Sequence, residues 1–455
     1  MSEPTLESLQ YTINTAYMLV ASAGVFVITP GIGLFYAGML RKNSAMQVIV
    51  QSYITTFVVT IQWWIWGYAL ALGDGSSFLG NLNMAFLKDS NPGPLVEGGP
   101  VPSAAYFIFS VFFPVCTVQI FLGSTAERGR MIPAQIIGFL FTTVVYCPLA
   151  YWFWAPKGWL LVLGTLDFAG GAPVHIAGGT ASLAYAMFLG PRKITPRFHA
   201  YKPHNATMSM IGTTLIWYGW LFFNSGTLQA VNTRTAYIML NTHLSASAAG
   251  MTYVIYDKIF HKKFSMMGAC EGAIAGLVAV TPSCGYVAPW AAFTGGIMTA
   301  LVCRLTINVN KWLRVDDAIY SFNLHAIGGC MGSLVTGFFA SSTWTDMDGS
   351  KDAIAGGWIA NHWVQIPYQL AGLGATIGWT FVVTYILCFV VDKIPGLKLR
   401  VDEDQELKGM DAYDILESAG ETIDGVIVNT TEILVAHTPA HTPDSGSFVR
   451  GEKKE

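Results

Sequence analysis

The sequence predicts an all-α membrane protein with eleven transmembrane helices, arranged as two inverted five-helix repeats plus one extra helix. Two observations predict the membrane class. Of the 455 residues, 53% are hydrophobic and only 12% are charged, whereas soluble domains carry about 25% charged residues. Apolar runs of about 20 residues also recur along the chain, the length that a membrane-spanning helix needs. The third observation is a repeated motif, His175-Ile-Ala-Gly-Gly and His325-Ala-Ile-Gly-Gly, which predicts the duplication.

Composition also narrows the function. A net charge of −3 excludes a strongly basic nucleic-acid-binding protein. The seven cysteines match no zinc or disulfide spacing, so we interpret them as small core residues. The sequence therefore predicts neither a metal nor a cofactor.

Eleven apolar segments define the domain organisation. We expect an external N-terminal segment over 1–16, a transmembrane domain over 17–400 and an acidic cytoplasmic tail over 401–455, disordered from about Thr430 onward. Repeat 1 covers about 17–190, repeat 2 about 208–340, and the eleventh helix about 366–391. The predicted spans are Tyr17–Leu40, Ala45–Leu72, Pro102–Gly123, Ile132–Trp154, Ala172–Leu189, Met208–Gly226, Ala236–Tyr256, Met267–Tyr286, Ala288–Thr306, Ser321–Ala340 and Ile366–Val391.

The distribution of Lys and Arg predicts the orientation. Seventeen of these residues fall in the loops on one side of the eleven spans. The loops on the other side hold four: Lys88, Lys157, Arg234 and Lys351. Because basic loops stay in the cytoplasm, the N-terminus is expected outside and the C-terminus inside.

The two histidine motifs lie 150 residues apart, in the fifth and tenth spans. An odd number of spans separates equivalent positions, so the two halves must insert with opposite polarity. Inverted repeats of this kind place their functional sites near the membrane midplane, between the halves. His175 and His325 are therefore expected to approach each other there.

Three interpretations of the histidine pair were compared. The plainest is two unrelated core histidines. Zinc binding is a second, but two histidines alone make a poor site, and no Cys, Asp or Glu stands at ligand spacing in those helices. The third is a pair of neutral, hydrogen-bonded imidazoles that line an apolar pore and relay a proton. Because the motif is repeated, we favour the third.

Other polar and aromatic residues near span ends leave alternatives open. Asp167 is either a helix cap, which we favour, or a carboxylate that shapes an outer cation site. The aromatic residues around Trp220, and Trp154, form either an interfacial belt, which we favour, or a cation–π box. Glu127 and Arg128 are expected to anchor cytoplasmic loops through ion pairs. Glu271, in the eighth span, is expected to be a buried polar residue with a partner.

Several of these motifs together resemble the ammonium transporter family (the Amt/Mep/Rh superfamily), on the Amt/Mep side. The resemblance extends over about Tyr17 to Arg400. The stretches that carry it are Asp167-Phe-Ala-Gly-Gly-Ala-Pro-Val-His175, Ala126-Glu127-Arg128, Gly219-Trp220, Phe223-Asn224, Thr281-Pro282 and Phe322-Asn-Leu-His325-Ala-Ile-Gly-Gly329.

The resemblance also implies functional roles for individual residues, which the motifs by themselves do not assign. It implies an outer recruitment site at Trp154, Phe113 and Thr227, with Trp220 beside them. It also implies a phenyl gate of Phe113 and Phe223 and twin pore histidines at His175 and His325; Asp167 would act structurally and electrostatically. The assembly implied is a homotrimer with one pore per subunit.

The chain departs from the family pattern at three places. Thr227 stands where many relatives have Ser, and Glu271 stands where relatives often have a neutral residue. In the tail, Gly409-Met410-Asp411 is not followed by the usual His-Gly-Glu motif, which removes the sequence basis for the usual tail-mediated coupling between subunits.

The function implied is inward movement of ammonium or ammonia across the plasma membrane. The chain would contact membrane lipid, and its tail would offer a surface for a cytoplasmic regulator. An electroneutral ammonia channel and an ammonium sensor are the alternatives. An intramembrane enzyme is not supported, because no Ser-His, Cys-His or paired-carboxylate arrangement occurs within a span.

Overall fold

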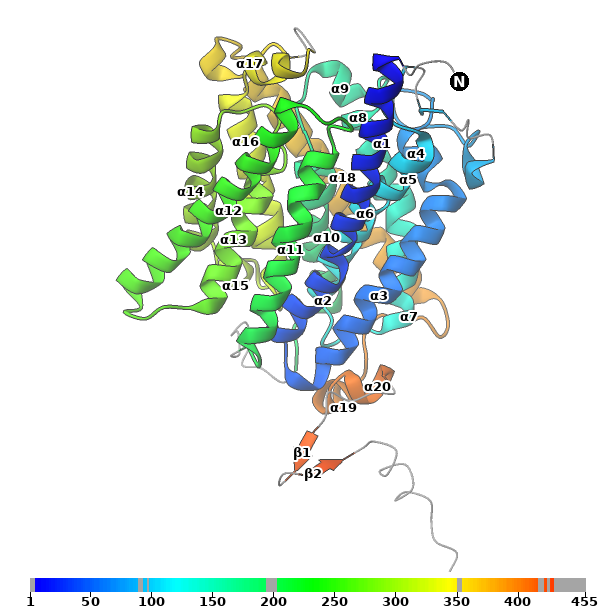
Figure 1. Ribbon diagram of the computed structural model, residues 1–455. Helices are drawn as coiled ribbons and strands as arrows, with labels where there is room; N and C mark the ends of the chain where they lie inside the picture. The colour runs from blue at the N-terminus through cyan, green and yellow to red at the C-terminus, as the bar shows by residue number, and fades with distance from the viewer. Residues whose placement is uncertain are drawn as a thin grey trace, which may run out of the picture.

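The structure, a computed structural model, is a bundle of long helices that run between two faces (Figure 1). It describes residues 5–88, 93–95, 98–193, 203–349 and 354–415, together with the backbone of two short strands in the tail. We call the face that carries α19 (Glu403–Lys408) and α20 (Asp411–Asp414) the tail face, and the other end the opposite face. Helix α1 (Leu6–Phe26) begins at the opposite face. The first helix and the tail thus lie at opposite ends of the bundle, as an odd number of crossings requires.

The first half of the bundle is built from helices that are often broken by π-helical turns. Its α-helices are α1, α2 (Ile28–Met39), α3 (Ala45–Gln62), α4 (Tyr68–Leu72), α5 (Ser103–Ser110), α6 (Phe112–Gly123), α7 (Met131–Phe141), α8 (Cys147–Trp154), α9 (Trp159–Leu163) and α10 (Ala177–Leu189). The π-helical turns are η2 (Trp63–Gly67), η4 (Thr142–Tyr146) and η5 (Gly171–Ile176), and the 3₁₀ turns are η1 (Lys42–Ser44) and η3 (Ala85–Leu87).

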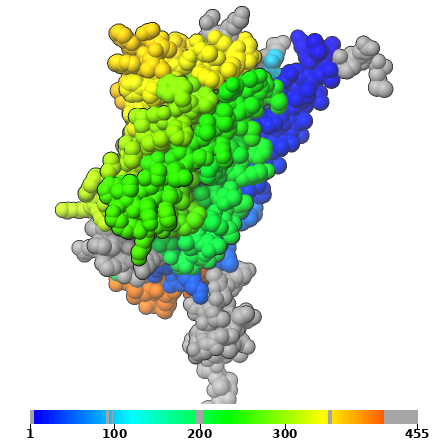
Figure 2. Space-filling view, turned by 60° about the vertical axis from the view of Figure 1, so that its left-hand side comes forward, coloured from blue at the N-terminus to red at the C-terminus, as the bar shows by residue number. Residues whose placement is uncertain are grey.

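The second half repeats this plan and adds a long last helix. Its α-helices are α11 (Ala206–Gly226), α12 (Thr233–Phe260), α13 (Met266–Val280), α14 (Pro289–Leu305), α15 (Val309–Leu313), α16 (Gly328–Phe339), α17 (Ser342–Thr345) and α18 (Gln365–Lys393). The other turns are the π-helical η6 (Phe322–Ile327) and the 3₁₀ turns η7 (Asp346–Asp348) and η8 (Trp358–Ala360). Figure 2 shows the side formed by α11 and α12, in green, between the orange tail helices and the yellow segments of the opposite face.

The prediction of an all-α membrane fold is confirmed. Six helical runs in the described residues are long and apolar enough to cross a membrane, and a seventh candidate, Phe322–Phe339 with Ser342–Asp348, is bent by 98°. The other predicted spans coincide with α11, α12, α13 and α14. Helices α13 and α14 have only 15 and 17 residues, and α12 has a mostly polar buried face. The count of eleven crossings therefore stays a prediction.

The first helix begins earlier than predicted. We expected the segment 1–16 to precede the first span, but α1 starts at Leu6, where the Thr5 hydroxyl accepts a hydrogen bond from the Ser8 N–H. An apolar window misses these first turns because they are polar and exposed. A Ser/Thr cap supplies the missing acceptor at a helix start.

Helix α18, which corresponds to the predicted extra span, lies on the outside of the bundle. Only 28% of its apolar window is buried. The buried stripe includes Gln369, whose amide donates to the Leu166 carbonyl and to Ser333, and whose oxygen accepts from the Leu166 N–H. The helix thus ties the loop before η5, in the first repeat, to α16 in the second.

Ion pairs join the loops of the tail face, as predicted for Glu127, whereas Arg128 forms hydrogen bonds to backbone carbonyls and no ion pair among the described residues. The Glu127 carboxylate bridges Arg41 and Arg192, and Arg192 also pairs with Asp316 at 2.6 Å. The Arg128 guanidinium donates to the Asp316 carbonyl at 2.6 Å. All these groups except Arg41 are buried, so each needs its partners to offset desolvation.

The tail continues this network. Glu406 of α19 pairs with Arg400 at 2.7 Å, and the Asp411 carboxylate accepts the N–H groups of Met46 and Gln47 at the start of α3. Burial raises the pKa of the Asp411 carboxyl, against the opposing effect of these donors. Strands β1 (Glu421–Ile423) and β2 (Val426–Val428) pair antiparallel. The predicted disorder from Thr430 onward lies outside the described residues.

Candidate functional site

Both histidines lie in π-helical turns that follow a buried aspartate. His175 is in η5 and His325 is in η6. The Asp167 carboxylate accepts the N–H groups of Gly170, Gly171 and Ala172 at 2.6–2.8 Å. π-Helical turns occur often at functional sites, because they displace side chains from the regular helical position.

Asp317 performs the same task in the second repeat, and sequence analysis missed it. Its carboxylate accepts the N–H groups of Ile319 and Phe322 at 3.2 and 2.9 Å. The signal was available, because Asp317 follows Asp167 by the same 150 residues that separate the histidines. Burial raises the pKa of both carboxyls to about 6, although the N–H donors oppose this shift.

Reciprocal glycine contacts bring the two repeats together. A Cβ at Gly179 would lie 2.3 Å from the Ala326 nitrogen, and a Cβ at Gly329 would lie 2.8 Å from the Ile176 side chain. These are equivalent positions: each glycine stands four residues after its own histidine and touches the residue next to the other histidine. The helices therefore cross about a local two-fold axis, and only glycine fits that crossing.

The crossing puts the histidines in direct contact. Their Nδ1 atoms are 3.3 Å apart, and the ring centroids are 5.5 Å apart. His175 is 2% exposed and His325 is 7% exposed. The His175 Nε2 atom is buried and has no hydrogen-bond partner among the described residues. Because one Nδ1 must donate while the other accepts, the pair is compatible with two neutral imidazoles.

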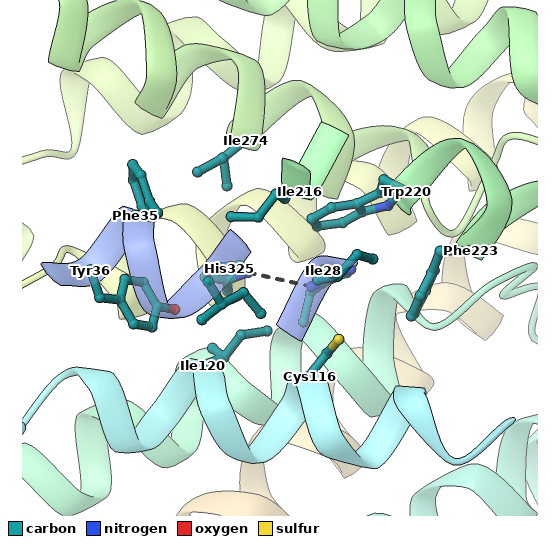
Figure 3. Close-up of a pocket in the computed structure, with 12 residues that line it drawn as sticks. Ile28, Phe35, Tyr36, Cys116, Ile120, Ile216, Trp220, Phe223, Ile274 and His325 are labelled. Atoms are coloured by element: carbon teal, nitrogen blue, oxygen red, sulfur yellow. Dashed lines mark hydrogen bonds between the residues drawn. The ribbon is translucent and has the colours of Figure 1, made fainter. Parts of the chain in front are cut away.

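The imidazoles line a narrow apolar cavity of about 30 Å³, large enough for a few water-sized molecules at most. Figure 3 shows it between α2, α6 and α11. Apart from the histidines, its lining is mostly aliphatic or aromatic: Ile28, Ile32, Phe35, Tyr36, Cys116, Ile120, Ile216, Trp220, Phe223 and Ile274.

Two stacked phenyl rings separate this cavity from a wider pocket on the opposite face. The rings of Phe113 and Phe223 are 4.0 Å apart between centroids. Phe223 lines the histidine cavity, whereas Phe113 lines the wider pocket of about 290 Å³. Phe113, Trp154 and Thr227 all line that pocket. The Trp154 ring meets Phe113 edge-on, and its indole N–H donates to the Asp167 carbonyl at 3.0 Å.

Trp220 corrects one prediction. We expected it in the outer recruitment site, but it lies beyond the phenyl pair, stacked on the His175 ring at 4.9 Å. Its indole N–H donates to the Thr281 hydroxyl at 2.8 Å. The reason is helical geometry: Trp220 precedes Phe223 by three residues, so it lies almost one turn deeper on the same face.

Two further predictions concern polar groups. Asp167 caps the start of η5, the interpretation that we favoured. Glu271 was expected to have a partner, but it forms no hydrogen bond or ion pair with any residue in the described part of the chain, although it is 7% exposed. Among the described residues, no three His, Cys, Asp or Glu side chains gather where they could hold a metal ion.

The fold and site define a polytopic membrane protein with a narrow apolar cavity that two imidazoles line and that stacked phenyl rings separate from a wider pocket. The Ammonium Transporter Family model matches residues 16–420, so the chain belongs to that family.

Individual relatives agree with this assignment. Ammonium transporter 3 of Schizosaccharomyces pombe is 43% identical, over 97% of this chain and 94% of its own length. The crystal structure of Candida albicans Mep2 is 38% identical and has a TM-score of 0.81, covering 86% of each chain. A protein described as a sensor Amt protein is 26% identical, with a TM-score of 0.81, over 89% of this chain and 99% of its own.

Proposed function

We propose that this protein carries ammonium inward across the plasma membrane by capturing the cation, deprotonating it and passing ammonia along the histidine pair. The observation that supports this most is the 3.3 Å contact between two buried imidazoles in an apolar cavity behind stacked phenyl rings. Such a cavity admits a small neutral molecule, and the imidazoles offer it hydrogen bonds.

Selectivity against potassium follows from this geometry. Potassium and ammonium have similar size and charge, so a cage of oxygen atoms would separate them poorly. A bare ion in a low-dielectric cavity loses several kcal/mol of hydration. Ammonium escapes that penalty by giving up its proton, and potassium has no proton to give.

Capture would occur in the aromatic pocket of the opposite face. The face of the Trp154 ring provides a cation–π surface, and Phe113 and the Thr227 hydroxyl oxygen line the same pocket. The Thr227 hydroxyl donates to the Phe223 carbonyl at 2.9 Å, which leaves its oxygen lone pairs to accept from ammonium. Asp167 would act at a distance, because its oxygens already accept three N–H groups.

The route of the proton distinguishes two versions of the mechanism. If the proton follows through His175 and His325, each turnover moves one charge. If it returns to the outer solution, the protein is an electroneutral ammonia channel. We favour the charge-moving version, because the contact of the two imidazoles continues a proton path across the narrowest part.

Orientation, assembly and regulation belong to the same proposal. The excess of Lys and Arg in the loops of the tail face supports a cytoplasmic tail face and an external N-terminus. We propose a homotrimer with one pore per subunit, embedded in membrane lipid. The acidic tail offers a cytoplasmic regulator a surface.

A second candidate function is ammonium sensing. A protein described as a sensor Amt protein shares the fold at a TM-score of 0.81. In a sensor the tail would carry the output, and transport would be slow or absent.

The test uses purified full-length protein in lipid vesicles with ammonium or potassium added on one side. We expect an ammonium-dependent current that saturates, and no potassium current. Internal acidification or alkalinisation without current would indicate the electroneutral channel. Binding of ammonium without either signal would indicate the sensor.

A further inference from the structure

A buried carboxylate that the histidine mechanism does not use lies between the histidine cavity and the tail face. Glu271 is on α13, three residues before Ile274, which lines the cavity beside His325 (Figure 3). Residues three apart on a helix are about 5–6 Å apart between Cβ atoms. Helix α13 starts near the tail face (Figure 1). Glu271 therefore lies about one turn beyond the cavity wall, towards the tail face.

The neighbours of Glu271 place other unpartnered oxygen atoms beside it. A Cβ at Gly268 would lie 2.1 Å from Asp257 Oδ2, and a Cβ at Gly272 would lie 2.9 Å from the Tyr253 side chain. These two glycines lie on the face of α13 that packs against α12, one turn apart, so Asp257 and Tyr253 contact the same turn of α13 that carries Glu271 and act on it electrostatically. Asp257 Oδ2 and the Tyr253 hydroxyl are both buried and lack a hydrogen-bond partner among the described residues.

The charges of this cluster do not balance. The charged groups that act on Glu271 are Arg304 and Asp257, and Arg304 is already paired with Asp257. The nearby His261 is largely exposed, 3.8 Å from Asp257. The other titratable groups facing the cluster are the Tyr253 and Tyr320 hydroxyls and the Cys270 and Cys303 thiols. In the buried part of the cluster, two carboxylates face one guanidinium, so one negative charge is left over when both carboxyls are ionised.

A buried surplus charge is costly unless a proton or a cation neutralises it. The donor set here consists of oxygen atoms that lack donors, and an ammonium ion supplies N–H donors and one positive charge. We propose that Glu271, with Tyr253 and Asp257 beside it, is an inner cation site that receives ammonium as it leaves the pore. This inference rests on the proposed function and adds a second binding site to it.

At this site a proton passes from the Glu271 carboxyl to ammonia. A proton that has crossed by the histidine pair is held on the Glu271 carboxylate. Ammonia arriving from the cavity takes that proton, so the carboxyl O–H bond breaks and the fourth N–H bond forms. The product is ammonium paired with the Glu271 carboxylate, and it leaves towards the tail face while the carboxylate stays.

The test measures ammonium-dependent flux, as current and as internal pH change, in vesicles of sorted orientation. Ammonium is supplied from the tail face or from the opposite face. For Glu271→Gln we expect the half-saturating concentration from the tail face to rise about tenfold, which corresponds to about 1.4 kcal/mol. The value from the opposite face should change less than about twofold.

Three further variants test whether the effect of Glu271→Gln is due to the loss of its negative charge. Glu271→Asp keeps the carboxylate and should stay within about threefold of the wild type. Asp257→Asn releases Arg304 to neutralise Glu271, so it should shift the tail-face value in the same direction as Glu271→Gln. Glu403→Gln removes a carboxylate from an exposed position on α19 and should change neither value.

Each contrary outcome has a meaning. Equal effects from both faces, or none, would overturn the inner site while leaving the proposed transport intact. Opposite behaviour of Asp257→Asn would overturn the charge argument even if Glu271→Gln failed to fold. A wild-type protein without ammonium-dependent flux would overturn the proposed function, and the inner site with it.

Discussion

The surroundings of the histidine cavity differ in chemistry towards the two faces of the bundle, although the same repeated frame builds both sides. At the opposite face the pocket is wide and aromatic, and the oxygens of its carboxylate, Asp167, accept three backbone N–H groups. Near the tail face the surroundings are ionic, with Glu271 uncompensated beside Asp257 and Arg304.

The two repeats share a set of backbone-determining residues and differ in the side chains around the two ends. In both repeats an aspartate caps a π-helical turn, a histidine follows eight residues later, and a glycine follows four residues after that. These positions set the backbone path and the contact of the imidazoles. The side chains around the two ends differ, which gives the histidine cavity a direction that its local two-fold symmetry alone would not give.

The largest expected effect is at the centre, where the two repeats are equivalent. His175→Ala or His325→Ala should lower saturable ammonium current by more than about tenfold, because either change cuts the proton path. The orphaned imidazole costs about 1–3 kcal/mol, so the protein should still insert and assemble. We also expect a potassium current if water enters the enlarged cavity. Normal ammonium currents with normal exclusion of potassium in both variants would make the histidines packing residues.

Alanine substitutions at the two glycines of the helix crossing should destabilise the protein to different extents. Gly179→Ala places a Cβ 2.3 Å from the Ala326 backbone nitrogen, whereas a Cβ at Gly329 would meet the Ile176 side chain at 2.8 Å and its first backbone atom, the Gly171 carbonyl oxygen, at 3.0 Å. We expect Gly179→Ala to destabilise the protein by about 1–3 kcal/mol, and Gly329→Ala by less. Thermal unfolding in detergent measures both.

Gly374→Ala on α18 is the matched control, because a Cβ there meets nothing within 4 Å. It should leave the unfolding midpoint unchanged or raise it slightly, since Ala favours helices over Gly by about 1 kcal/mol. If Gly179→Ala behaved like this control, the close crossing would not be a constraint on the fold.

A substitution in the aromatic pocket should change only the capture of ammonium. Trp154→Leu removes a cation–π surface worth about 0.5–2 kcal/mol, which raises the half-saturating ammonium concentration roughly twofold to thirtyfold. The effect should appear when ammonium is supplied at the opposite face. Trp290→Leu, at an exposed position on α14, should leave the concentration dependence unchanged. An unchanged Trp154→Leu would return that residue to the interfacial belt.

The last expected effect concerns the caps and appears only as a dependence of stability on pH. Folding raises the pKa of Asp317 from 3.8 to about 6. Its contribution to folding is therefore fully present below about pH 4 and is lost as the pH rises through about 6. The Asp317→Asn variant has no ionisable group at this position. The difference in unfolding free energy between the wild type and this variant should therefore fall by up to roughly 2–3 kcal/mol as the pH rises over that interval.

The measurement is the unfolding midpoint of both proteins in detergent from about pH 4 to about pH 7. Asp167→Asn should give the same trend, because burial raises the pKa of Asp167 to about 6 as well. Parallel curves for variant and wild type would show that the cap carboxyl does not change its proton affinity on folding.

Much of the site could be predicted from the sequence. The repeated motif predicted that His175 and His325 meet. The aromatic residues near span ends favoured an interfacial belt over a cation–π box, and the grouping of Trp154, Phe113 and Thr227 was implied only by the family resemblance. Asp317 was missed because the comparison of the two halves stopped at the histidines. Trp220 was predicted in the outer recruitment site, although it lies beside the histidine cavity. The end of an apolar run does not fix how deep in the membrane a nearby residue lies, and Trp220 precedes Phe223 by three residues.

The sequence by itself determined the membrane class, the duplication and the inverted relation of the halves. These follow from composition and from spacing, which are properties of the chain in order. Only the tertiary structure decided that Trp220 stacks on His175, that Gly179 and Gly329 make reciprocal contacts, and that Glu271 lacks a partner. The reason is that burial and partnership depend on which helices cross, and residues distant in sequence meet only after those helices have packed.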